Sequence, residues 1–110
     1  MEYSEVRTLY DNKVKHALPE KNPEKICEAL LSIAYYDADW RHAQDICIAH
    51  LENPNPDIRG LAATCLGHIA RIHGHLDKDL VLSALNRKLD DPLIKGQVSD
   101  ALDDIRTFMS

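Results

Sequence analysis

The segment that decides the fold is residues 64–70, Thr-Cys-Leu-Gly-His-Ile-Ala, because similar segments lie 36 residues before and after it. Residues 28–34 read Glu-Ala-Leu-Leu-Ser-Ile-Ala, and residues 100–106 read Asp-Ala-Leu-Asp-Asp-Ile-Arg. Four apolar positions recur at this offset: Ile26, Ala62 and Val98; Ala29, Cys65 and Ala101; Leu30, Leu66 and Leu102; Ile33, Ile69 and Ile105. Their spacing of i, i+3, i+4 and i+7 marks one face of an α-helix. The constant offset predicts three copies of one structural unit.

Each repeated helix is preceded by a second helical pattern, and these patterns cover about residues 4–18, 39–51 and 77–89. An N-cap residue followed by a proline marks three helix starts, at Asn22-Pro23, Asn55-Pro56 and Asp91-Pro92. Gly74 marks a helix end after His73. The sequence therefore predicts six helices in three stacked hairpins, with repeats at about 1–36, 37–74 and 75–110. An ordinary six-helix bundle with accidental repetition is the alternative.

Composition supports a single helical domain that binds protein. The chain has 110 residues, of which 45% are hydrophobic but only 5% aromatic, so its core must be aliphatic. Strands prefer β-branched and aromatic residues, and this composition therefore favours helices. The net charge is −5. Because nucleic-acid binding relies on Lys and Arg neutralising phosphates, an acidic chain is better suited to a basic protein partner.

The three cysteines, Cys27, Cys47 and Cys65, lie in helical apolar patterns without CxxC spacing, which predicts small core or groove residues in a reducing compartment. The polar N-terminus is unlike a signal peptide. No apolar run approaches the roughly 18 residues of a membrane span. We therefore expect a cytoplasmic protein without cofactor or membrane contact.

The middle repeat, residues 51–70, resembles the HEAT-repeat pattern, in which a proline precedes the second helix and is followed by Asp, a β-branched residue and Arg. The matching residues are Pro56, Asp57, Ile58, Arg59, Ala62, Leu66, Gly67 and Ile69. The third repeat matches less closely, with Ile94-Lys95 in place of Ile-Arg, and the first keeps only the apolar frame. The resemblance implies a right-handed α-α superhelix whose second helices line a binding surface. Most proteins of this family are interaction scaffolds, a few resemble bilin lyases, and a larger relative class excises DNA bases.

The face opposite the apolar stripe of the second helices is the predicted binding surface. Its centre is formed by small residues, Gly60, Ala63, Thr64 and Gly67, which would let a partner backbone approach closely. The predicted partner-binding residues are Glu24, Glu28, Leu31, Tyr35, Arg71, Asp100, Asp103 and Asp104. A solvated acidic face with a stray Leu and Tyr is the alternative, since scattered exposed apolar residues are normal.

No residue pattern predicts a metal site or a catalytic site. The aspartates at 100, 103 and 104 lack the glycine bend of a calcium loop. His68, His73 and His75 lack the i, i+4 spacing of a helical zinc site, so they are expected at the helix surface. No nucleophile has a base partner at motif level. Trp40 is expected to cover the edge of the core, with an interface role as the alternative.

These observations favour a binding module that is not an enzyme. The small, acidic format also looks like some bacterial immunity proteins, which neutralise a toxin encoded beside them. An inhibitor of a basic, nuclease-type toxin is the leading hypothesis, and a HEAT adaptor or assembly subunit is the alternative. A lyase-type enzyme is less favoured because three repeats barely curve. The chain is expected to be a monomer or a weak homodimer, with Leu9, Tyr10 and Phe108 as candidate contacts.

Overall fold

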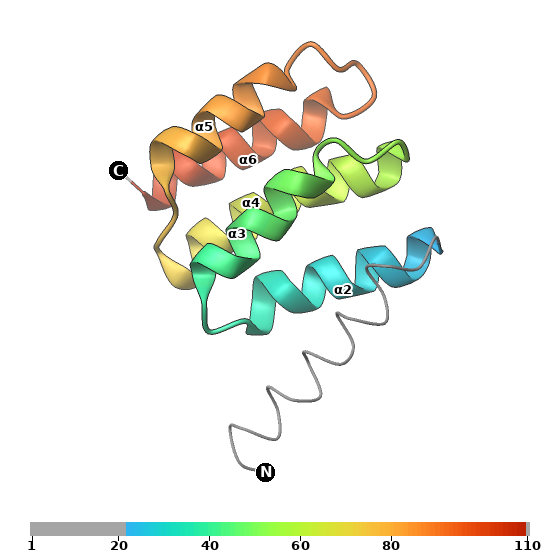
Figure 1. Ribbon diagram of the computed structural model, residues 1–110. Coiled ribbons are helices and arrows are strands. Elements are labelled where there is room, and N and C mark those ends of the chain that lie inside the picture. Colours follow the sequence, from blue (N-terminus) through green and yellow to red (C-terminus); the bar gives the residue numbers. More distant parts are fainter. Residues whose placement is uncertain (1–21, 110) are drawn as a thin grey trace.

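The computed structural model describes residues 22–109, and five helices lie within that range (Figure 1). Their bounds are α2 (Pro23–Tyr36), α3 (Trp40–His50), α4 (Pro56–His73), α5 (Lys78–Arg87) and α6 (Lys95–Phe108). No strand occurs between residues 22 and 109, which confirms the predicted all-helical class. The helix predicted over residues 4–18 falls outside the described residues.

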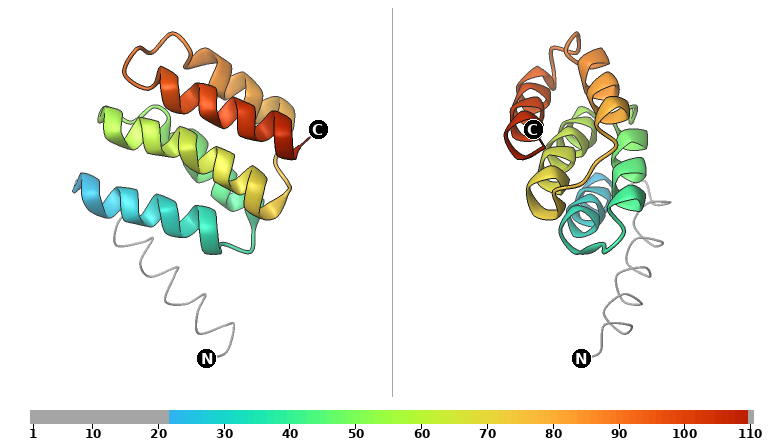
Figure 2. Two further views of the ribbon diagram at one scale, coloured as in Figure 1. Left: turned by 180° about the vertical axis from the view of Figure 1, so that it is seen from behind. Right: turned by 90° about the vertical axis from the view of Figure 1, so that its left-hand side faces the viewer.

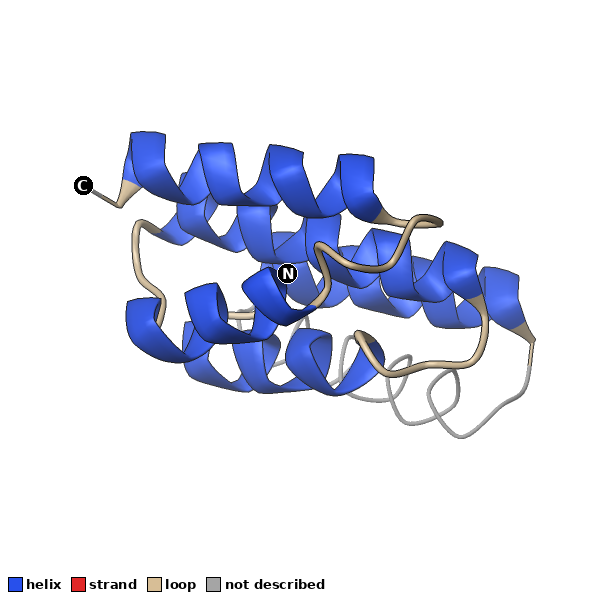
Figure 3. Cartoon of the chain, turned by 90° about the horizontal axis from the view of Figure 1, so that it is seen from above, coloured by secondary structure: helices blue, strands red, loops and turns tan. Residues whose placement is uncertain are grey.

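The helices are arranged in two layers. In one layer α2, α4 and α6 lie side by side and run in the same direction, and α3 and α5 cover one side of that layer (Figure 2). Short loops join the helices, as the view from above shows (Figure 3). Because α4 lies between α2 and α6 and also packs on α3, it is the most enclosed helix of the described chain.

The repeated apolar positions form the core, as their spacing predicts. All of them in α2, α4 and α6 are at most 6% exposed. Burying each Leu or Ile side chain stabilises the fold by about 1.5–3 kcal/mol. In α5 the buried residues are Val81, Ala84 and Leu85. Leu80, predicted on the same buried side, is instead 45% exposed, because it lies at the edge of the stripe that these three residues define.

Two of the three predicted proline starts are confirmed. The side chains of Asn22 and Asn55 accept hydrogen bonds from the backbone N–H groups of Glu24 and Asp57, and a proline follows each cap. Such caps satisfy backbone donors that have no partner within the helix. The predicted stop at Gly74 is also confirmed, because this residue has φ 65°, in the left-handed region that glycine adopts without strain.

The third predicted start was wrong. Helix α6 begins at Lys95, after Ile94, and not at Pro92. The Asp91 carboxylate accepts from the backbone N–H of Leu93 with one oxygen and from Arg59 Nε, 3.0 Å away, with the other. Asp91 thus closes a turn and holds a residue of the preceding repeat, so it does not cap the helix.

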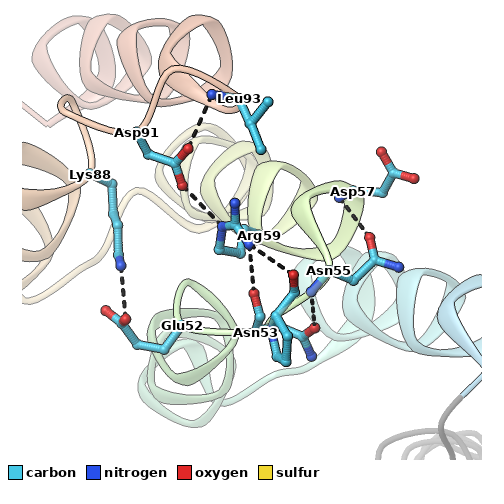
Figure 4. A network of polar contacts seen from close by, with 9 residues as sticks. Glu52, Asn53, Asn55, Asp57, Arg59, Lys88, Asp91 and Leu93 are labelled. Atoms are coloured by element: carbon cyan, nitrogen blue, oxygen red, sulfur yellow. Dashed lines mark hydrogen bonds and ion pairs between the residues drawn. The ribbon is translucent and has the colours of Figure 1, made fainter.

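Arg59, the arginine of the HEAT-like pattern, joins the two hairpin loops. Its Nη1 donates to the carbonyl oxygens of Asn53 and Pro54, and its Nε donates to Asp91 (Figure 4). A second bridge between the same loops runs from Lys88 Nζ to Glu52 at 2.8 Å. The side chain of Arg59 is only 14% exposed, so its hydrogen bonds are largely shielded from water.

Two buried polar side chains fix the connections between α2 and α3 and between α4 and α5. Gln44 Oε1 accepts from the backbone N–H of Asp77 at 2.6 Å, which joins α3 to the start of α5. Asp37, between α2 and α3, is 1% exposed. Its carboxylate accepts from the backbone N–H of Asp39 and contacts the ring of His42 at 2.6 Å. Buried polar groups with partners fix the relative position of the elements that they join.

Candidate functional site

The outward side of the layer formed by α2, α4 and α6, which we call the second-helix face, carries the predicted partner-binding residues. On each helix, helical spacing turns these residues away from the α3–α5 layer. Six are exposed and two, Leu31 and Asp104, are half-buried: the exposed ones are Glu24, Glu28, Tyr35, Arg71, Asp100 and Asp103. Leu31 also packs against the core, so only part of its surface remains available to a partner.

The second-helix face carries more acidic than basic side chains, and the same helices also expose Lys25, Lys95 and Arg106. Glu24 and Glu28 lie on α2, while Asp100, Asp103 and Asp104 lie on α6, with α4 between the two groups. Exposed Asp57, in the first turn of α4, adds a further carboxylate that the sequence analysis had not assigned to this surface. Asp103 also pairs with Arg106 at 3.3 Å, but both side chains are exposed, and such pairs contribute little to stability.

The predicted small-residue centre of this face is not open to a partner. Of its four residues, Gly60, Ala63 and Gly67 are buried and Thr64 is half-buried. A Cβ at Gly60 would lie 3.1 Å from Gln97 Nε2, and one at Gly67 would lie 3.3 Å from the Cα of Ala101. These residues therefore let α6 approach α4. The prediction was wrong because α4 has a helix on each side within its layer. Its residues that face α6 are therefore buried in addition to the apolar stripe that faces the core.

A cluster on the second-helix face joins three of the predicted residues through a histidine, and we call it the Tyr35 cluster. The rings of Tyr35 on α2 and His68 on α4 lie 5.2 Å apart. Arg71 Nη2 lies 2.9 Å from His68 Nδ1. Asp104 on α6 reaches over Gly67, where a Cβ would lie 2.8 Å from its Oδ2 atom. The cluster therefore includes side chains from all three helices of the layer.

The surroundings of His68 favour its neutral form. Burial, followed by the positive charge of Arg71, lowers the pKa of His68 below its ordinary value, and the negative charge of Asp104 opposes this shift. A hydrogen bond from Arg71 requires Nδ1 to accept, so the ring proton must lie on Nε2. Protonation of Nδ1 would break that bond and place two positive charges side by side.

Trp40, His73 and His75 have structural contacts. Trp40 packs against the core, as predicted, with its ring 6.0 Å from that of His75 and the Arg41 guanidinium 4.9 Å away. His73 Nε2 contacts the carbonyl oxygen of Ala34 at 3.2 Å, which joins α4 to α2. Among residues 22–109, no group of three His, Cys, Asp or Glu side chains is placed to hold a metal ion.

The thiols of Cys27 and Cys47 are poor nucleophiles at neutral pH. Burial, with a smaller contribution from the charge of Asp57, raises the pKa of Cys27. A hydrogen bond to Cys65, together with complete burial, raises the pKa of Cys47 well above its ordinary value. Because the thiolate is the reactive form, both side chains act as small core residues. All three cysteines are free, as predicted.

One chain in a solved structure is similar to this protein over most of its length. A chain in the "Crystal structure of CDI complex from Cupriavidus taiwanensis LMG 19424" is 38% identical, with a TM-score of 0.82. The match covers 90% of this chain and 89% of that chain. The protein belongs to the same family as that chain of the CDI complex. No protein-family model and no curated protein matches the sequence.

The structure adds His68 and Asp57 to the predicted surface. The i, i+3 spacing of His68 and Arg71 was visible in the sequence, but their contact with Tyr35 and Asp104 depends on how α2 and α6 pack against α4. No helix within residues 22–109 is both long and apolar enough to cross a bilayer.

The protonation of His68 provides a direct test of the Tyr35 cluster. We expect His68 to titrate below the ordinary histidine value of about 6.5. In the Arg71→Ala variant the midpoint should rise, because the variant lacks the neighbouring positive charge. Because the folded pKa is lowered, this group's contribution to stability should be present above about 6.5 and lost as the pH falls from there through the lower pKa of the folded state. The midpoints can be measured from the ring Cε1–H signal by NMR. A midpoint at or above the ordinary value, unchanged by Arg71→Ala, would contradict this geometry.

Proposed function

We propose that this protein is the immunity protein of a contact-dependent inhibition (CDI) pair and that it neutralises a toxin domain by binding it. One observation carries the proposal: the chain is 38% identical to a chain of a CDI complex over nine-tenths of both lengths. The protein acts by covering its partner, since inhibition by occlusion requires no chemistry from the inhibitor. On this proposal it is not an enzyme.

The charge of the second-helix face supports a basic partner, such as a nuclease-type toxin. A site that normally meets phosphate carries positive charge, and acidic side chains complement it. The α3–α5 layer has a mixed surface, where exposed Arg41, Lys78 and Arg87 accompany exposed Asp45 and Asp79. We therefore assign binding to the second-helix face and specifically to Glu24, Glu28, Leu31, Tyr35, Arg71, Asp100, Asp103 and Asp104.

The architecture that we propose for the whole chain is a HEAT-like superhelix of three hairpins in one domain. The parallel packing of α2, α4 and α6 at the 36-residue offset supports it. A cytoplasmic location and a monomeric or weakly dimeric state remain predictions from the sequence.

The direct test is protection of a cell. The C-terminal toxin domain of the protein encoded by the adjacent gene is expressed in a bacterial host with or without this chain. We expect growth arrest by the toxin domain alone and normal growth when both are expressed, with the two purified proteins forming a stable complex. If the host is not protected and no complex forms, the proposal is wrong.

The charge of the face should control the rate of association. We expect Asp100→Lys with Asp103→Lys to slow association with that toxin domain by about tenfold at low salt, because the attraction that steers the encounter is weakened. The rate should also depend less on ionic strength. Stopped-flow mixing at several salt concentrations measures both effects.

The matched control for this double variant is Asp45→Lys with Asp79→Lys, which changes the net charge equally but lies on the α3–α5 layer. It should slow association much less. If both double variants behave alike, net charge controls the rate and the second-helix face has no special role.

A further inference from the structure

A large, exposed apolar side chain lies at or next to the last residue of α2, α4 and α6. Tyr36, Ile72 and Phe108 are spaced 36 residues apart, so they occupy one equivalent position in the three repeats. They are 75%, 43% and 50% exposed, respectively. The position is not required by the core, whose repeated residues are almost fully buried. Large apolar residues that recur outside the core therefore need another explanation.

Helix packing brings the three helix ends that carry these residues to one edge of the molecule. The residues lie in the last turns of α2, α4 and α6, which are parallel and end on the same side (Figure 2). The register of α4 against α6 is close to the repeat offset, since Gly60 lies against Gln97 and Gly67 against Ala101. Neighbouring packed helices lie about 8–10 Å apart, so the three residues form a row roughly 20 Å long. We call this row the apolar edge.

The apolar edge continues directly into the second-helix face. Tyr35 lies beside Tyr36, with ring centroids 6.3 Å apart, and its ring also contacts His68 of the Tyr35 cluster. Arg71 immediately precedes Ile72 in the last turn of α4. The acidic side chains Glu24, Asp57 and Asp100 lie nearer the other ends of these helices, whereas Asp103 and Asp104 lie in the half of α6 that ends at Phe108. The apolar edge thus adjoins a surface that carries acidic side chains along its length.

On the basis of the proposed function, we propose that the apolar edge is the anchor of the toxin interface. Its occupant is an apolar patch on the basic toxin domain, next to the Lys and Arg side chains that face the acidic residues. Charge complementarity favours this occupant, because the edge and the acidic residues belong to one continuous face of the same three helices. Interfaces commonly combine a few apolar and aromatic anchors with a charged rim. The acidic part controls association, and the apolar edge controls how long the complex lasts.

Serine substitutions at the apolar edge test this assignment. In the triple variant Tyr36→Ser, Ile72→Ser and Phe108→Ser, we expect dissociation from the purified toxin domain of the adjacent gene to become about 100-fold faster. Association should change by no more than about threefold, because the charges remain. Surface-immobilised binding kinetics give both rates. Thermal unfolding followed by circular dichroism establishes that the variant is folded, as expected for three exposed positions.

Leu93→Ser is the matched control, because Leu93 is 66% exposed and lies before the first turn of α6, away from the apolar edge. It should dissociate like the wild type. An unchanged dissociation rate in the triple variant would overturn the inference while leaving the proposed function intact. If the wild-type chain neither binds nor protects, both are wrong.

A second copy of the chain is the competing occupant of the apolar edge. Sedimentation equilibrium separates the two cases. If the wild type dimerises and the triple variant does not, while both bind the toxin domain equally, the edge is a dimer contact and the inference is wrong. A monomeric wild type whose complex is shortened by the triple substitution supports it.

Discussion

Gly67→Leu is expected to destabilise the fold by about 3 kcal/mol, because overpacking at a close helix contact forces the backbones apart. A Cβ alone at this position would lie 2.8 Å from Asp104 Oδ2 and 3.3 Å from the Cα of Ala101. The carboxylate can rotate away, but Ala101 Cα belongs to the backbone of α6. The remaining atoms of leucine therefore have no space unless α6 moves. Urea unfolding followed by circular dichroism measures the change.

Gly96 provides the control, since a Cβ added at this residue would have no atom within 4 Å, apart from its own helix and chain neighbours. Gly96→Ala should leave stability unchanged or raise it by up to about 1 kcal/mol, because alanine favours the helix more than glycine does. Gly67→Ala should fall between the two variants. If Gly67→Leu unfolds at the wild-type urea concentration, α4 and α6 do not pack as described.

Arg59→Ala is expected to destabilise the protein by about 2 kcal/mol, because it breaks hydrogen bonds that involve charged groups and leaves partners unpaired. Arg59 donates to Asp91 and to the carbonyl oxygens of Asn53 and Pro54. The Asp91 side chain is 21% exposed, so water can replace only part of what it loses. The measurement is again urea unfolding, with the slope of the transition compared between variants.

Arg106→Ala is the matched control. Arg106 pairs with Asp103 at the surface, where the two side chains are 67% and 73% exposed. It should change stability by less than about 0.5 kcal/mol. The double-mutant cycle of Arg59→Ala with Asp91→Ala should show coupling, since the two side chains contact each other directly. Equal effects of Arg59→Ala and Arg106→Ala would show that the loop network does not stabilise the fold.

The helices could be predicted because their evidence is local. Each repeated stripe, such as Ala62, Cys65, Leu66 and Ile69, contains its own period, and a period of 3.6 residues needs no information from the rest of the chain. The starts at Asn22-Pro23 and Asn55-Pro56 are local as well, since a cap binds an N–H group only two residues away. Asp91-Pro92 has the same pattern, but no helix starts there, because the aspartate binds Arg59, 32 residues earlier in the chain.

The candidate site could be predicted only in part. Outward positions such as Asp100 and Tyr35 follow from the apolar stripe, since they lie across the helix from it, and both are exposed. The small residues Gly60 and Gly67 were misassigned because the stripe of one helix does not show that a neighbour will approach from the side. His68 was missed for a similar reason, because its partner Tyr35 belongs to another repeat.

The sequence by itself determined the helical class, the 36-residue repeat, the aliphatic core and the acidic character of this protein, because periodicity, composition and charge are properties of the chain. The packing of the helices decides which small residues are covered, which side chains meet in the Tyr35 cluster, and that Tyr36, Ile72 and Phe108 stay exposed. These features depend on the distance and register between packed helices. Long-range contacts set that geometry, and no single helix contains it.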